Sequence, residues 1–180
     1  TRCCKVTGVQ TCALPIWFED IVLKESTSEL LNCFVSENVE GVQSEINRWL
    51  RKSISFHDAR ENFYHGFLLG LLSGDDKYDV KSNRENGDGR TDITICEYQT
   101  RKIAVVIEIN SFTKLPTVGL KTAERFGELE KRCEDGLRQI EENRYAEQLK
   151  DDWYEKVITY SVSFNGKTCK VKQGDTLTRN

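Results

Sequence analysis

Residues 103–107 are apolar at every position, and this run constrains the fold of the chain more than any other segment. A strand with one face in water alternates apolar and polar residues, whereas an inner strand covered on both faces is apolar throughout. Residues 102–109 are therefore predicted to form a central strand that is buried on both faces. Glu108 is a charged residue at the end of this strand.

Helical and strand-like patterns surround the central strand. Asp58 is a suitable N-cap for an amphipathic helix that reaches Leu72 and is closed by Ser73-Gly74. Asn165-Gly166 separates two strand-like runs, which is a strong signal for a hairpin. The predicted elements are a helix over residues 58–72, strands over 78–82, 91–98 and 102–109, a helix over 122–149, and strands over 156–164 and 167–172. This order predicts an α/β fold.

The segment before these elements has a helical pattern. Val42, Ile46 and Trp49 follow one another at spacings of four and three, as on one face of a helix. Two or three helices over residues 17–53 are too few to bury a core alone. We expect them to be a short helical segment left from an upstream domain, and we expect the tail over residues 173–180 to be frayed.

Residues 6–16 look like the translation of a common sequencing adapter. We therefore expect residues 1–16 to be an artefact joined to a fragment of a longer protein, an interpretation that fits the absence of any methionine. A signal peptide is the alternative, but Lys5, Gln10 and Pro15 interrupt the sustained apolar stretch that it needs.

Composition excludes several classes of protein. The chain has 26 Lys and Arg against 29 Asp and Glu, a net charge of −3, which argues against a basic nonspecific coat for nucleic acid. No apolar run approaches the ~18–20 residues that cross a bilayer. The seven cysteines form no CxxC pair or Cys/His cluster, so neither a zinc site nor a disulfide framework is predicted, and a reducing, cytoplasmic location is expected.

Three acidic residues occupy unusual places. Glu61 lies in the first turn of an otherwise apolar helix, Asp92 opens a strand after a Gly-rich turn, and Glu108 ends the apolar strand. Adjacent strands can bring such carboxylates together, and Mg²⁺ needs only one or two protein carboxylates beside water and phosphate. The alternative is that Glu61 favours the helix dipole, Asp92 is a turn residue and Glu108 is a polar strand end.

Four ordered blocks make the chain resemble a PD-(D/E)xK nuclease superfamily domain over about residues 55–172. They are residues 61–72 (ENFYHGFLLGLL), 82–93 (SNRENGDGRTDI), 106–110 (VIEIN) and 139–146 (QIEENRYA). More narrowly, the chain looks like the nuclease-like domain at the C-terminus of bacterial AAA-ATPase-like proteins. The resemblance implies a restriction-endonuclease-like core with a central mixed sheet flanked by helices. It also implies DNA as a partner, Mg²⁺ or Mn²⁺ as cofactor, an upstream ATPase-like domain and no association with a membrane.

The resemblance also implies roles for particular residues. Glu61 matches the helix carboxylate, Asp92 the metal-binding aspartate and Glu108 the acid of the E-x-K element, so that all three are implied metal ligands. Gln139 and Tyr145 match a Q-x₅-Y element that faces the active site or the bound strand.

Two basic residues and one histidine leave alternatives open. Arg84 and Arg90 flank the Gly-rich turn, where they either contact phosphate or belong to a solvated loop. His65 is either a general base or a packed residue of an amphipathic helix, and the helix pattern favours packing.

The sequence departs from the family at the E-x-K lysine, because the residue at that position is Asn110. An amide can donate a hydrogen bond but does not supply the positive charge that a lysine places beside the scissile phosphate. Lys114 or Lys102 is a possible replacement. Two functions follow: a metal-dependent DNA nuclease, weakened at Asn110, or a catalytically inactive nuclease fold that binds DNA or protein.

Overall fold

The computed structural model describes residues 27–53, 61–86, 89–112 and 122–179. Its elements are α2 (Thr27–Val35), α3 (Val39–Ser53), α4 (Glu61–Leu72), β1 (Tyr78–Asn86), β2 (Gly89–Glu97), β3 (Ile103–Ser111), α5 (Thr122–Glu142), α6 (Tyr145–Asp151), β4 (Lys156–Asn165) and β5 (Thr168–Thr178). The adapter-like residues 1–16 and the expected N-cap Asp58 lie outside these ranges. Within them, no helix combines the length and the apolar character that crossing a bilayer requires.

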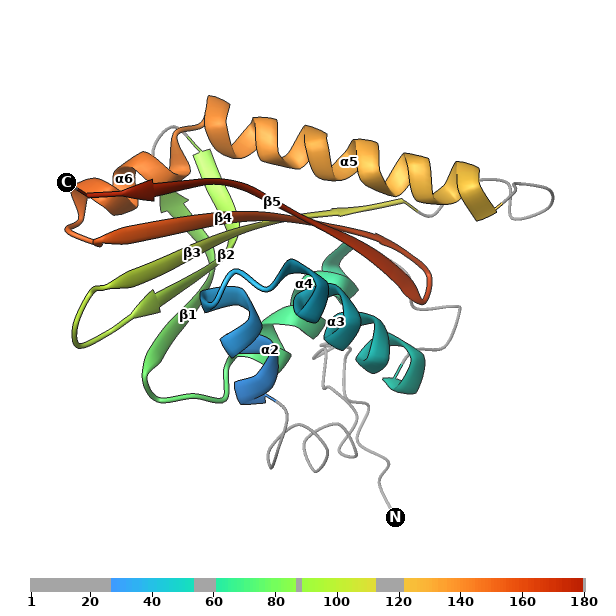
Figure 1. Ribbon diagram of the computed structural model, residues 1–180, viewed down its shortest axis with the longest axis horizontal. Helices are drawn as coiled ribbons and strands as arrows, with labels where there is room; N and C mark the ends of the chain where they lie inside the picture. Colours follow the sequence, from blue (N-terminus) through green and yellow to red (C-terminus); the bar gives the residue numbers. More distant parts are fainter. Residues whose placement is uncertain (1–26, 54–60, 87–88, 113–121, 180) are drawn as a thin grey trace, which may run out of the picture.

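One five-stranded sheet forms the centre of the fold, in the order β1-β2-β3-β4-β5. Neighbouring strands are antiparallel except β3 and β4, which are parallel. Helices α5 and α6 cover one face, and α2, α3 and α4 cover the other (Figure 1). Residues 104–109 of β3 are all buried, which confirms the prediction of a central strand covered on both sides. The fold is thus α/β, with a mixed sheet flanked by helices and consistent with a restriction-endonuclease-like core.

The main apolar core lies between the sheet and helices α2, α3 and α4. Phe34 of α2 meets Tyr160 of β4 edge to face, with ring centroids 5.0 Å apart. Tyr64 of α4 stacks on Phe164 of β4 at 4.4 Å. A smaller apolar cluster lies between the sheet and the pair α5 and α6. Each face of the sheet therefore has its own hydrophobic layer, as an all-apolar central strand requires.

Helices α2 and α3 belong to the same core as the sheet. Their fully buried side chains there are Leu30, Leu31, Phe34, Val42, Ile46 and Leu50. Asn47 Oδ1 accepts a hydrogen bond from the main-chain N–H of Cys169 at 2.9 Å, and Gln43 Oε1 accepts one from that of Val171 at 3.1 Å. These amides satisfy main-chain groups of the edge strand β5. Residues 27–53 therefore pack as part of the domain, although the sequence interpretation set them apart from it; their origin in an upstream domain stays a prediction.

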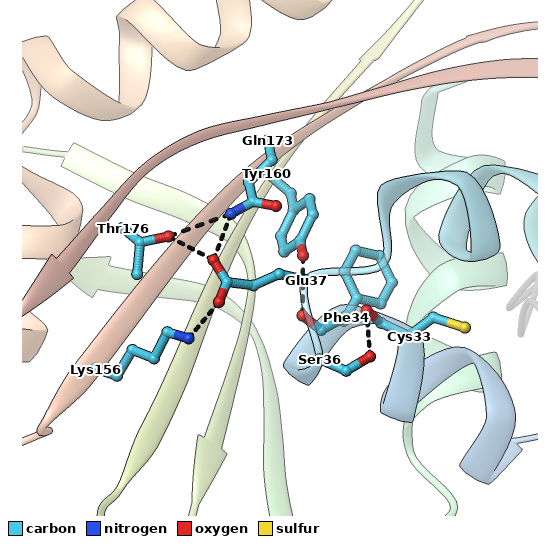
Figure 2. Close-up of polar contacts among 8 residues, drawn as sticks. All are labelled: Cys33, Phe34, Ser36, Glu37, Lys156, Tyr160, Gln173 and Thr176. Carbon is cyan, nitrogen blue, oxygen red and sulfur yellow. Dashed lines mark hydrogen bonds and ion pairs between the residues drawn. The ribbon is translucent and has the colours of Figure 1, made fainter.

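Glu37, in the turn between α2 and α3, forms hydrogen bonds and an ion pair with residues of strands β4 and β5 (Figure 2). Its backbone has a φ of 61°. Its carboxylate accepts hydrogen bonds from Gln173 Nε2 at 2.7 Å and Thr176 Oγ1 at 2.9 Å, and it forms an ion pair with Lys156. The expectation of a frayed tail after Gln173 is wrong, because β5 continues to Thr178 and pairs there with β4.

The long helix predicted over residues 122–149 is two helices. α5 ends at Glu142 and α6 begins at Tyr145. Arg144, between them, has a φ of 55°, a left-handed conformation in which a regular helix does not continue.

The predicted hairpin at Asn165-Gly166 is confirmed. Asn165 pairs with Thr168, and Gly166 has a φ of 57°, which glycine adopts without steric cost. The hydroxyl of Tyr64 donates a hydrogen bond to the carbonyl oxygen of Gly166 at 2.9 Å. This contact joins the hairpin to α4.

Candidate active site

Asp92 and Glu108 come together because of the register between β2 and β3. The antiparallel pairing includes Ile93 opposite Ile107, so Asp92 and Glu108 are the next positions of the two strands and share one side of the sheet. Asp92 Oδ2 accepts a hydrogen bond from the main-chain N–H of Ile109, at 2.8 Å. The carboxylate of Asp92 is therefore held against the residue that follows Glu108.

Asp92 is a partly buried acid with two further contacts. Burial raises the pKa of its carboxyl, while the hydrogen bond from Ile109 and the charge of His65 act in the opposite direction. Its main-chain oxygen lies 2.9 Å from Nε2 of His65, on helix α4. An acid whose charged form is penalised by burial gains from a nearby cation.

Glu108 is buried in the second half of β3, with 5% of its surface exposed. Gln139, an exposed residue of α5, donates a hydrogen bond from Nε2 to Oε1 of Glu108 at 2.6 Å. An amide that donates to one carboxylate oxygen fixes the orientation of the group. The structure thus brings together Asp92, Glu108 and Gln139, three of the residues that the sequence analysis singled out.

The donor set of this site fits a hard divalent cation. Mg²⁺ takes oxygen ligands and needs only one or two carboxylates, since it keeps several waters. Asp92 and Glu108 supply that number from adjacent strands. In the parts of the chain that the structure describes, no group of three or more acidic, histidine or cysteine side chains gathers as a metal site. The side chain of Glu61, the third predicted ligand, lies outside the described residues.

A sequence model of the PD-(D/E)XK nuclease superfamily matches residues 59–174. The chain belongs to this superfamily. The match includes α4, the whole of β1 to β4 and the helix that carries Gln139. Comparisons with curated proteins and with solved structures give no significant match. PD-(D/E)XK nucleases generally depend on a divalent metal.

Asn110, at the lysine position of the superfamily motif, lies under helix α5. Its Nδ2 is 3.4 Å from the carbonyl oxygen of Arg132. Gly136 makes this close approach possible, because a Cβ there would lie 2.6 Å from Nδ2 of Asn110. Lys102 directly precedes β3 and is eight residues before Asn110, about 26 Å away at the usual strand rise, so it does not replace the motif lysine. Lys114 lies outside the described residues.

The remaining predicted residues are placed as follows. Tyr145 is the first residue of α6 and is 2% exposed within the smaller apolar cluster. Its surroundings are those of a packing residue, separated from Gln139 by the break between α5 and α6. Arg84 and Arg90 lie where β1 and β2 pair, close to the turn, but their side chains are outside the described residues.

Two contacts at the site were not predicted from the sequence. His65 reaches the main chain of Asp92, whereas the helix pattern favoured simple packing. The guanidinium of Arg132 lies 4.8 Å from the ring centre of Phe112, just beyond the end of β3. Neither contact has a signature in the sequence, because each joins segments that only the fold brings together.

Proposed function

We propose that this chain hydrolyses phosphodiester bonds in DNA with the help of Mg²⁺ or Mn²⁺. The observation that carries the proposal is the meeting of Asp92 and Glu108 at adjacent strand positions in a PD-(D/E)XK domain. Each of the two acids is held by its own partner, Ile109 or Gln139. Such fixed carboxylates favour a metal centre over a pair of unrelated surface charges.

The roles of the chain's own residues follow from these contacts. Asp92 and Glu108 would hold the cation. The N–H of Ile109 holds Oδ2 of Asp92, and Gln139 holds Oε1 of Glu108, so both ligands are oriented before substrate arrives. A bound divalent cation supplies activation of water and neutralisation of charge on the phosphate. Glu61 is proposed as a further ligand from the first turn of α4.

Asn110 in place of the motif lysine is expected to lower the rate of DNA cleavage. A motif lysine stabilises negative charge that develops on the phosphate, and loss of one such group costs about 10²–10³ in rate, or about 3–4 kcal/mol. Asn110 directs its amide toward the main chain of α5. We therefore propose a slow nuclease.

A second candidate function is a catalytically inactive domain that binds DNA or protein, and Asn110 favours it. In this alternative the carboxylate pair binds a cation for structure or for contact with phosphate, without turnover.

The wider setting of the domain is also a proposal. The resemblance to the nuclease-like domain of bacterial AAA-ATPase-like proteins supports an upstream ATPase-like partner domain and a place in the bacterial cytoplasm. Arg84 and Arg90 are proposed as phosphate contacts beside the turn between β1 and β2.

The deciding experiment compares the wild-type chain with Asp92→Asn and Glu108→Gln, which remove charge but keep shape. Mn²⁺ binding is followed by calorimetry, and cleavage is followed on linear duplex and single-stranded DNA. The nuclease proposal expects metal binding and slow cleavage in the wild type and neither in the variants. Metal binding without any cleavage supports the binding module instead, and no metal binding in the wild type contradicts the metal site.

A further inference from the structure

The contact between His65 and Asp92 has a defined direction. Nε2 of His65 lies 2.9 Å from the main-chain oxygen of Asp92, and both groups are partly buried. A carbonyl oxygen only accepts hydrogen bonds, so Nε2 must carry the proton. A ring nitrogen that donates to a carbonyl is not available to take a proton from water. The geometry therefore does not suit His65 as a general base through Nε2.

Asp92 lies in strand β2, next to Ile93, which pairs with both neighbouring strands. The pairing of β2 with β3 extends to Ile93 opposite Ile107, and that of β2 with β1 passes from Ser82 opposite Ile93 to Arg84 opposite Thr91. The register between β1 and β2 is the same on both sides of Asp92. The carbonyl group of Asp92 is held by His65, and its carboxylate by the N–H of Ile109.

We propose that His65 is a positioning residue that fixes the main chain of Asp92 and thereby aims its carboxylate at the cation. This inference rests on the proposed function and adds a residue to it. His65 acts through Asp92, in the way that a partner behind a metal ligand orients that ligand. The N–H of His65 holds the carbonyl group of Asp92 from helix α4, so the main chain that carries the Asp92 carboxylate keeps one position.

Helix α4 holds His65 in place by contacts that do not involve the histidine. The preceding residue, Tyr64, stacks on Phe164 and donates a hydrogen bond to Gly166. Phe67 and Leu68 are buried in the main core. Replacement of His65 should therefore leave α4 in place and remove only the hydrogen bond to the main-chain oxygen of Asp92.

The test uses the full chain with three variants on α4. His65→Leu removes the donor and keeps much of the volume, while His65→Gln retains an N–H near the position of Nε2. Gly66→Ala is the matched control, because a Cβ at Gly66 meets nothing within 4 Å. Mn²⁺ affinity is measured by calorimetry, with thermal unfolding of the metal-free protein in parallel.

We expect His65→Leu to weaken Mn²⁺ binding about 10-fold or more, which is usual for loss of a partner behind a metal ligand. His65→Gln should restore most of the affinity, and Gly66→Ala should match the wild type. Unchanged affinity in His65→Leu, or no rescue by His65→Gln, overturns the positioning role. A wild-type chain that binds no Mn²⁺ overturns the proposed metal site itself, and the role of His65 with it.

A second measurement is made on the metal-free wild-type protein and does not depend on metal binding. Long-range proton–nitrogen NMR of the metal-free wild type, with His65→Gln to assign the signals, shows which ring nitrogen of His65 carries the proton. We expect Nε2 to be protonated in the neutral ring. A proton on Nδ1 alone overturns the contact and the proposal.

Discussion

Gln139 donates a hydrogen bond to the buried carboxylate of Glu108, with Nε2 and Oε1 2.6 Å apart. The contact joins helix α5 to the second half of β3, where the candidate cation site lies. Helix α5 thus covers the sheet and also supports a candidate metal ligand.

Gln139→Leu should therefore weaken Mn²⁺ binding about 10- to 100-fold, since a carboxylate ligand that loses its orienting partner binds metal less well. The measurement is calorimetric titration of the folded variant. Lys131→Leu, at an exposed position of the same helix, is the control and should bind as the wild type does. Equal affinities for Gln139→Leu and the wild type would show that Gln139 does not orient Glu108.

Asn110→Lys should raise DNA cleavage by up to about 10²–10³-fold, because it restores positive charge near the scissile phosphate. Helix α5 packs closely on residue 110 at Gly136. The longer lysine side chain does not fit beneath the helix there and has to extend toward Glu108. Cleavage of linear and single-stranded DNA is measured with Mn²⁺ and with Mg²⁺. The double variant with Glu108→Gln is the background control. Cleavage at the level of that control, in a folded variant that binds metal, would favour the inactive binding module.

Asp92→Asn should stabilise the metal-free protein at neutral pH while it abolishes metal binding. Burial raises the pKa of Asp92 above its ordinary value of 3.8. The folded state therefore loses stability, relative to the unfolded state, as pH rises from 3.8 through that raised pKa. Asparagine removes this penalty, so its advantage in melting temperature at pH 7 should shrink as pH falls. Added Mn²⁺ should raise the melting temperature of the wild type only.

Glu37→Gln should lower the free energy of unfolding at pH 7 by about 1.5–3 kcal/mol, the usual contribution of a hydrogen bond to a charged group. The hydrogen bond from Lys156 is the main cause that lowers the pKa of Glu37 from its ordinary 4.5. Its stabilisation is therefore complete above pH 4.5 and is lost as pH falls through the lowered pKa. Denaturant unfolding at pH 7 and at acid pH tests this. The exposed Glu155→Gln is the control; a difference that persists in acid would contradict the ion pair as the cause.

Two truncations test where the folding unit begins. Deletion of residues 1–16 should leave the melting temperature within a couple of degrees of the full chain, because an adapter-derived segment has no evolved packing partners. Deletion of residues 1–53 should prevent cooperative folding, since it removes Leu30, Phe34 and Ile46 from the main core. Cooperative unfolding of the shorter chain would show that α2 and α3 are dispensable.

Much of the fold could be predicted because its signals are local. The apolar run at residues 103–107 required a strand covered on both faces, and Asn165-Gly166 required a tight hairpin. Asp92 and Glu108 could be selected as candidates because a charged residue at a buried strand costs free energy unless the charge is paired, hydrogen-bonded or bound to a metal. These inferences need only the chemistry of a residue and of its near neighbours in the chain.

The break at Arg144 and the long strand β5 could not be predicted in the same way. A left-handed residue inside an otherwise helical pattern is set by how α6 packs its buried face on the sheet. The end of β5 looked unstructured because its residues are polar. Gln173 and Thr176 are held there by Glu37, which lies 136 and 139 positions away in the chain.

The amino-acid sequence is enough to predict the α/β class, the central strand, the hairpin, the resemblance to the nuclease superfamily and the choice of Asp92 and Glu108 as candidate ligands. The folded structure was needed to show that α2 and α3 share the core, that Gln139 supports Glu108, that His65 holds the main chain of Asp92 and that α5 covers Asn110. The reason is physical. Secondary structure follows periodicity and turn chemistry over a few residues, whereas each of these contacts joins side chains far apart in the sequence and exists only once the sheet has set the distance between them.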